Sequence, residues 1–159
     1  QATCAKELIE DQPDLHAIVS PVGGGGLLAG TCLSARYFSS GLAVYGAEPE
    51  HADDAYRSLK SGHLVTEHEP NTIADGLRTT LGDLTFPIIR ERVADILLCS
   101  EEEILAAMRL IWERLKIVVE PSCATALAVV LKNPDTFRGK RVGLIVTGGN
   151  VDLEQNFFG

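Results

Sequence analysis

Residues 16–30 read HAIVSPVGGGGLLAG, a short apolar run, four consecutive glycines and a second apolar run. The first run, 16–20, has the length and composition of a buried strand, and the second opens a helix that we expect to reach Phe38. A strand that ends in glycine and restarts as a helix leaves backbone N–H groups at the positive end of the helix dipole. Glycine is needed because a side chain would block close approach to these groups. The pattern predicts a phosphate-binding loop, and the apolar flanks disfavour the alternative of a flexible glycine turn.

Strand patterns and helix patterns alternate along the rest of the chain. This alternation implies a parallel sheet with right-handed crossovers. We therefore predict an α/β fold in three layers, a mostly parallel sheet with helices on both faces. The further strands are expected at 42–47, 96–99 and 142–146. The further helices are expected at 3–11, 53–59, 88–93, from residue 100 onward and at 121–131, with 63–76 as a polar loop.

The helix that begins after Ser100 has the clearest pattern. Glu103 follows Ser100 at the spacing of a capping box, and Pro121 suits the first turn of the next helix. Apolar residues recur at helical spacing on one face, which predicts that this face belongs to the core. They are Ile104, Leu105, Met108, Ile111, Trp112 and Leu115.

Composition limits the classes of partner. The 159 residues suit one domain, and 14 Lys and Arg against 22 Asp and Glu give a net charge of −8. This charge argues against nucleic acid or an anionic membrane as a partner, and no apolar stretch reaches transmembrane length. The four cysteines form no C-x-x-C pair, so we expect reduced, mostly core thiols and a cytoplasmic location. They are Cys4, Cys32, Cys99 and Cys123.

A nucleotide site is one interpretation of the glycines. Gly24-x-Gly26-x-x-Ala29 fits a loose dinucleotide fingerprint, and Glu48 ends the next expected strand, near the distance for a ribose contact. The motif is weak alone, and an NAD(P)-binding Rossmann-type domain stays open as an alternative. A Walker loop is excluded because no Gly-Lys-Ser/Thr follows the glycines.

A series of motifs, in the same order along the chain as in a known enzyme family, favours a different interpretation of the glycines. Residues 22–30, VGGGGLLAG, resemble the phosphate loop of fold-type II pyridoxal-phosphate enzymes, the serine racemase and serine/threonine dehydratase group. The resemblance spans nearly the whole chain, and several motifs in order are more specific than one glycine run. The further matches are AEP at 47–49, ADD at 52–54, TIADG at 72–76, WER at 112–114, VEP at 119–121 and TGGNVD at 147–152.

The resemblance implies a site for pyridoxal 5'-phosphate. Gly76 would pass close to the cofactor, Glu120 would lie near its ring and Thr147 would face the pyridine nitrogen. A hydroxyl cannot hold a pyridinium proton as an aspartate would, so the ring stays mostly neutral, which suits β-elimination better than transamination. Many relatives carry serine at this place, and a threonine that merely caps the loop is the alternative. The phosphate would be held by Gly23, Gly24, Gly25, Gly26 and the Leu27 amide.

Similarity to serine-racemase-like enzymes also implies a divalent-cation site at Glu48, Ala52 and Asp54. Two carboxylates and a backbone carbonyl are hard oxygen donors that suit Mg²⁺, Ca²⁺ or Mn²⁺ with water. The alternative is that Asp53 and Asp54 cap the first turn of a helix. The histidines share no metal-ligand spacing, so they are assigned no chemistry. They are His16, His51, His63 and His68.

Two further residues, Lys116 and Asn150, match positions that contact a nucleotide at the dimer interface of animal serine racemases. This feature is not general in the family. The resemblance therefore implies a homodimer and allows nucleotide regulation.

The resemblance also implies what residues 1–159 would contain. None of the five lysines lies in the family's Ser-x-Lys-x-Arg-type motif, so the Schiff-base lysine and the small domain are expected in a segment before Gln1. The chain would be one partial large domain that binds the cofactor and is inactive alone. The full-length enzyme would be a serine/threonine dehydratase (ammonia-lyase), forming a keto acid and ammonia from hydroxy amino acids, or a serine racemase. A non-catalytic binding fragment is the remaining alternative.

Overall fold

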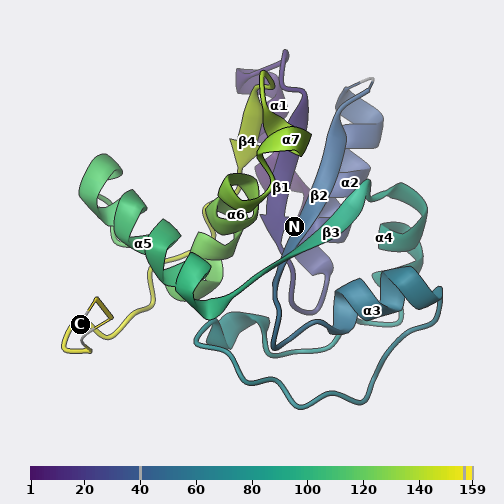
Figure 1. The fold of residues 1–159 in the computed structure, drawn as a ribbon. Helices are drawn as coiled ribbons and strands as arrows, with labels where there is room; N and C mark the ends of the chain where they lie inside the picture. Colours follow the sequence, from purple (N-terminus) through teal and green to yellow (C-terminus); the bar gives the residue numbers. More distant parts are fainter. Residues whose placement is uncertain (40, 156, 159) are drawn as a thin grey trace.

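A computed structural model describes residues 1–39, 41–155 and 157–158. A four-stranded parallel sheet lies at its centre, with strand order β3-β2-β1-β4 (Figure 1). Ala17 of β1 pairs with Ala43 of β2 on one side and with Val142 of β4 on the other. Because the chain passes to β2 on one side of β1 and returns as β4 on the other, the loops after β1 and β4 meet at one edge of the sheet. The strands are β1 (Ala17–Pro21), β2 (Ala43–Pro49), β3 (Asp95–Cys99) and β4 (Val142–Leu144).

Helices cover both faces of this sheet, with α2 and α4 on one face and α5 and α6 on the other (Figure 1). Alternate residues of β1 point to opposite sides, since Val19 joins the core beneath α6 while Ile18 packs with α1. The predicted three-layer α/β fold is confirmed. The helices are α1 (Ala2–Asp11), α2 (Gly26–Phe38), α3 (Asp54–Ser61), α4 (Phe86–Arg92), α5 (Glu101–Leu115), α6 (Pro121–Lys132) and α7 (Pro134–Phe137), with a 3-10 turn η1 (Asp75–Leu77).

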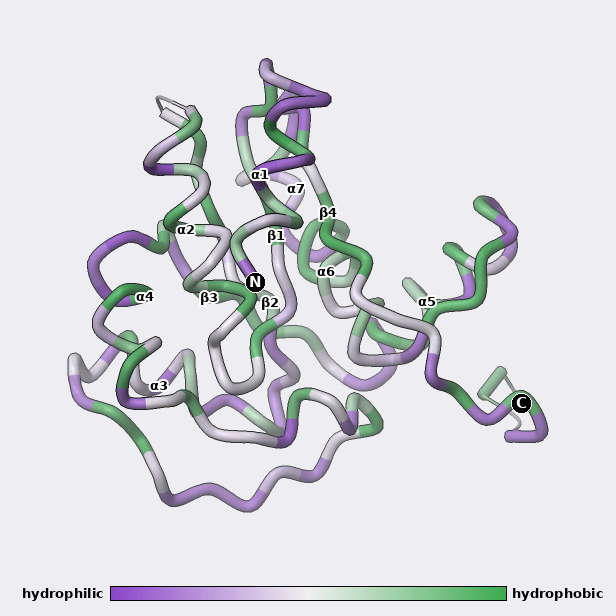
Figure 2. Tube along the Cα trace, turned by 180° about the vertical axis from the view of Figure 1, so that it is seen from behind, coloured by the Kyte–Doolittle hydropathy of each residue, from purple (hydrophilic) through white to green (hydrophobic). Residues whose placement is uncertain are grey.

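The expected elements are present with small shifts in their ends. The segment between α3 and η1 is a largely hydrophilic loop along the outside of the molecule (Figure 2). Two short elements, α7 and η1, were not expected, and β4 ends at Leu144 rather than at Val146. The N–H of Ile145 still donates to Val19 O at 3.1 Å, so the chain stays beside β1 after the strand ends.

The helix α5 confirms the capping box and corrects one core prediction. Ser100 Oγ accepts from the Glu103 N–H at 3.3 Å, and Glu103 Oε2 accepts from the Ser100 N–H at 2.8 Å. The expected core stripe fails at Leu115, which is 62% exposed because the last turn of α5 projects beyond the sheet (Figure 1). The residues buried on this face are Ile104, Ala107, Met108 and Ile111, with Leu105 and Trp112 partly buried.

All four thiols are free, as expected, and three of them are buried. Cys4 on α1 is the exposed one, so the prediction of mostly core thiols is confirmed. No helix in the described part of the chain combines the length and the apolar character needed to cross a bilayer.

Candidate functional site

A cavity of about 230 Å³ lies at the carboxyl ends of β1 and β4. It is formed where the glycine loop, η1, the start of α6 and the segment after β4 come together. Every residue that the sequence assigned to the cofactor lines this cavity. They are Gly23, Gly24, Gly25, Gly26, Leu27, Gly76, Glu120 and Thr147, joined by Pro21, Leu77 and Ser122, which the sequence analysis missed.

The glycine loop leaves the first turn of α2 open to a ligand. Gly25 is the N-cap of the helix and has a φ of 82°, a conformation that favours glycine. Within the described residues no side chain caps α2, and its first turn has no acidic residue. The first intrahelical bond runs from the Ala29 N–H to Gly25 O at 2.8 Å, so the amides of the preceding residues have no partner within the helix. These outward N–H groups suit an anion.

Side chains of α6 and its N-cap hold the other loops around the cavity. Ser122 Oγ accepts from the Gly76 N–H at 3.0 Å, which ties η1 to α6. Glu120 Oε2 accepts from the Asn150 N–H at 2.9 Å, and the Glu120 N–H donates to Gly148 O at 3.1 Å. A Cβ on Gly148 would lie 3.2 Å from both Glu120 carboxylate oxygens, so glycine lets the carboxylate approach. The only sequence signal for Ser122 is its place directly after the matched motif at 119–121.

The residues predicted to bind a metal lie at the start of α3. Glu48 is the second-last residue of β2 and is 1% exposed. Its Oε1 accepts from the Ala55 N–H at 3.0 Å and its Oε2 accepts from the Tyr56 N–H at 2.9 Å. Asp53 is the N-cap residue of α3 and Asp54 is an acidic residue of its first turn, as the alternative expected, but the amides of that turn donate to Glu48, and Asp53 pairs with Arg57 at 2.8 Å without making a cap bond.

Asp54 completes this buried acidic pair. It is 1% exposed, and its Oδ2 accepts from the Leu81 N–H at 2.9 Å. Burial raises the pKa of the Glu48 carboxyl to about 8, with a smaller upward effect from the charges of Asp54 and Asp53. Burial likewise raises the pKa of Asp54. Among the described residues no three His, Cys, Asp or Glu side chains converge as a metal cluster, so a cation here would also need the Ala52 carbonyl and water.

The dinucleotide interpretation does not fit this geometry. Glu48 is 1% exposed and is not among the residues that line the cavity at the glycine loop, so it does not face a ribose bound there. Lys116 and Asn150 are both exposed, and Asn150 lines a separate cavity of about 330 Å³ with Asp75 and Arg78. Lys116 is not among the residues that line that cavity.

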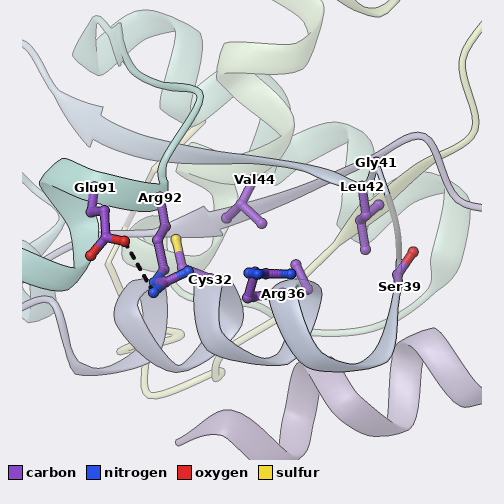
Figure 3. Close-up of a pocket in the computed structure, with 9 residues that line it drawn as sticks. Cys32, Arg36, Ser39, Gly41, Leu42, Val44, Glu91 and Arg92 are labelled. Carbon is purple, nitrogen blue, oxygen red and sulfur yellow. Dashed lines mark ion pairs between the residues drawn. The ribbon is translucent and has the colours of Figure 1, made fainter.

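A larger cavity of about 410 Å³ lies between α2 and α4 and contains none of the predicted site residues. Figure 3 shows Arg92 reaching from α4 toward α2, beside Cys32, and Arg92 pairs with Glu91 at 3.1 Å. Burial raises the pKa of the Cys32 thiol to about 12, so the thiol stays protonated near neutral pH and is a poor nucleophile.

Known proteins share both the sequence and the fold. A beta-hydroxyaspartate dehydratase from Paracoccus denitrificans is 53% identical over 155 residues, which cover 98% of this chain and 49% of that protein. The crystal structure of the serine racemase from Dictyostelium discoideum superposes with a TM-score of 0.89 at 52% identity, over 96% of this chain and 49% of that one. The structure of maize serine racemase gives a TM-score of 0.91 at 41% identity, over 96% and 48% of the two chains.

The chain spans about half the length of the curated relatives it matches. The family described as "Pyridoxal-phosphate dependent enzyme" matches residues 1–148, which is most of the sequence. These similarities support the resemblance drawn from the motifs and not the dinucleotide alternative. The chain belongs to the family of pyridoxal-phosphate dependent enzymes.

Proposed function

We propose that the intact protein is a pyridoxal-phosphate enzyme that dehydrates small hydroxy amino acids to a keto acid and ammonia, or racemises serine. The names of the relatives, a beta-hydroxyaspartate dehydratase and a serine racemase, support this substrate class. The observation that carries the proposal is the uncapped first turn of α2, whose amides line the cavity behind four glycines. A phosphate bound there would accept hydrogen bonds from these amides, and the positive end of the helix dipole would stabilise its negative charge.

Within this proposal, the residues of the chain bind and orient the cofactor. The amides of Gly24, Gly26 and Leu27 would hold its phosphate, and the backbone of Gly76 would pass beside the ring. Ser122 would keep Gly76 in place through its hydrogen bond to the Gly76 N–H. Bound pyridoxal phosphate supplies an electron sink for the α-carbon of the substrate.

Thr147 and Glu120 would set the electronic environment of the ring. A threonine hydroxyl offers the pyridine nitrogen a hydrogen bond but no counter-charge for a ring proton. A neutral ring is a weaker sink, which suits loss of a β-hydroxyl. Glu120 lies near the ring position but accepts a hydrogen bond from Asn150, so its carboxylate is held away from the pyridine nitrogen in this proposal.

A divalent cation, Mg²⁺ or a similar ion, would bind at Glu48, Ala52 and Asp54. The residues fit because Glu48 and Asp54 are both buried carboxylates, and burial raises the pKa of each. In addition, Asp54 Oδ1 is buried without a hydrogen-bond partner among the described residues. A cation would offset the energetic cost of burying the two carboxylates and the cost of leaving Asp54 Oδ1 without a hydrogen bond. This site lies at the start of α3, so it would stabilise the fold rather than take part in the reaction.

Three further parts of the proposal rest on the resemblance. The intact protein would form a homodimer in the cytoplasm, and Lys116 and Asn150 would contact a nucleotide. The exposed position of both side chains is compatible with such a contact. A binding protein without catalysis is the competing function, and activity of the intact protein would exclude it.

The experiment compares Gly24→Asp with Gly24→Asn in the intact protein. A Cβ at Gly24 has room, since its nearest neighbours would lie at 3.8 and 3.9 Å. Both variants add similar bulk, but only aspartate places a negative charge beside the phosphate. We expect pyridoxal phosphate, titrated by its absorbance, to bind at least tenfold more weakly to Gly24→Asp than to Gly24→Asn. Equal affinities would show that the phosphate binds elsewhere.

A further inference from the structure

The segment 72–77 brings Gly76 to the cavity at the glycine loop. Gly76 lines that cavity, and a Cβ on Gly23 would lie 3.0 Å from Gly76 O, so the segment packs directly against the glycine loop. Ser122 Oγ, from α6, accepts from the Gly76 N–H at 3.0 Å. One hydrogen bond fixes a single point of the segment and leaves its orientation open. The direction in which Gly76 faces the cavity therefore depends on a second attachment.

Glu101, the first residue of α5, provides this second attachment. Its Oε2 accepts from the Ile73 N–H at 2.8 Å, and the side chain of Ile73 packs against the core cluster that contains residues of α5 and α6. Glu101 Oε1 is buried and has no hydrogen-bond partner in the described part of the chain. The carboxylate is therefore committed to Ile73, and a hydrogen bond to a carboxylate is stronger than one between neutral groups.

Hydrogen bonds inside the segment carry this constraint from Ile73 to Gly76. Ile73 O accepts from the Asp75 N–H at 2.9 Å, and Asp75 Oδ1 accepts from the Gly76 N–H at 2.9 Å. Ala74 O accepts from the Leu77 N–H at 2.9 Å, which closes the turn η1 around Gly76. Because consecutive residues are linked in this way, a displacement of Ile73 also displaces Gly76.

We propose that Glu101 is a positioning residue of the cofactor site, which sets the place of Gly76 beside the ring by holding the Ile73 N–H. The inference rests on the proposed function, since it takes Gly76 as a neighbour of the bound ring. Glu101 is not among the residues that line the cavity, so it acts through Gly76 and not by contact with a ligand. Its loss alters the surroundings of the ring and leaves the phosphate on the glycine loop.

The first test needs no cofactor and measures amide hydrogen exchange in the intact protein after removal of pyridoxal phosphate. Glu101→Ala takes away the acceptor of the Ile73 N–H, so we expect the amides of both Ile73 and Gly76 to exchange about tenfold faster. Glu101→Gln keeps an oxygen that can accept from Ile73 and should restore slow exchange at both. Faster exchange at Ile73 alone would overturn the inference, because the constraint would then end before Gly76.

The matched control is Glu102→Ala. Glu102 is exposed in the same first turn of α5, and its Oε2 accepts from Ser100 Oγ at 2.8 Å instead of from the segment 72–77. Its replacement also removes one negative charge from the start of the helix, so it matches any general loss of helix stability. It should leave the exchange of the Ile73 and Gly76 amides unchanged. Equal effects of Glu101→Ala and Glu102→Ala would reduce the role of Glu101 to helix stability and overturn the inference.

The second test uses the intact protein with bound pyridoxal phosphate. Induced circular dichroism of its absorption band reports the setting of the ring, and its phosphorus NMR signal reports the phosphate. We expect Glu101→Ala to lose induced circular dichroism while the phosphorus signal stays in place, and Glu101→Gln to restore the dichroism. Unchanged dichroism in Glu101→Ala would overturn this inference alone. If the unmodified protein takes up no pyridoxal phosphate, the proposed function fails and this inference fails with it.

Discussion

Replacing Gly25 by alanine tests the junction between β1 and α2. A Cβ at this position would lie 2.7 Å from Leu81 Cδ2, 2.7 Å from Thr85 Oγ1 and 2.9 Å from Ile89 Cδ1. These contacts are too short, so side chains of the α4 layer must move, at a cost of about 1–3 kcal/mol. The φ of 82° adds roughly 1–2 kcal/mol for a residue with a side chain. We therefore expect Gly25→Ala to lower the free energy of unfolding by about 2–5 kcal/mol.

The matched control is Gly62→Ala. Gly62 has a φ of 76°, but a Cβ there would meet nothing within 4 Å. It carries the backbone cost without the overlap, so we expect a loss of only about 1–2 kcal/mol. Urea denaturation of the intact protein, followed by circular dichroism, gives both values. If Gly25→Ala costs no more than Gly62→Ala, the packing of the glycine loop against Leu81, Thr85 and Ile89 is not as described.

Two further predictions concern the cofactor and the thiols. Thr147→Val keeps the shape of the side chain and removes its hydroxyl, so the affinity for pyridoxal phosphate should fall about five- to tenfold, which is the contribution of a neutral hydrogen bond. Thr147→Ser keeps the hydroxyl and should retain the affinity. An unchanged affinity in Thr147→Val, measured by absorbance titration, would contradict the pyridine contact. Burial raises the pKa of Cys32 and of Cys99 to about 12. Near pH 8 the folded protein should therefore react with iodoacetamide at exposed Cys4 and not at these two cysteines, as mass spectrometry of the labelled peptides would show. Labelling of Cys32 and Cys99 should begin only as the pH approaches 12 or the protein unfolds.

Much of the fold follows from local patterns. The strand at 17–21, the glycines after it and the capping box at Ser100 are short-range features, and the chemistry of each acts within a few residues. The alternation of strands and helices then implies parallel strands whose carboxyl ends share one edge. For this reason the residues assigned to the cofactor, from Gly23 to Thr147, were expected at one site and line one cavity.

The errors occur where a local pattern meets a boundary of the packed structure. Leu115 continues the apolar period of α5, but the sheet ends before the helix does, so nothing covers that turn in the described part of the chain. The spacing of apolar residues predicts which residues share a face of a helix, but it does not predict how far the sheet that covers this face extends.

By itself, the amino-acid sequence determined the class of fold, the position of the glycine loop between strand and helix, and the family, because these depend on spacing along the chain. Only the tertiary structure decided what the buried acids do. It turned both Glu48 oxygens onto the amides of α3, joined Asp54 to Leu81, and brought His68 to Asp54 Oδ1. The contacts of Asp54 join segments that are far apart along the chain. The partners of all these atoms are selected by the desolvation of polar groups during packing, which no local spacing encodes.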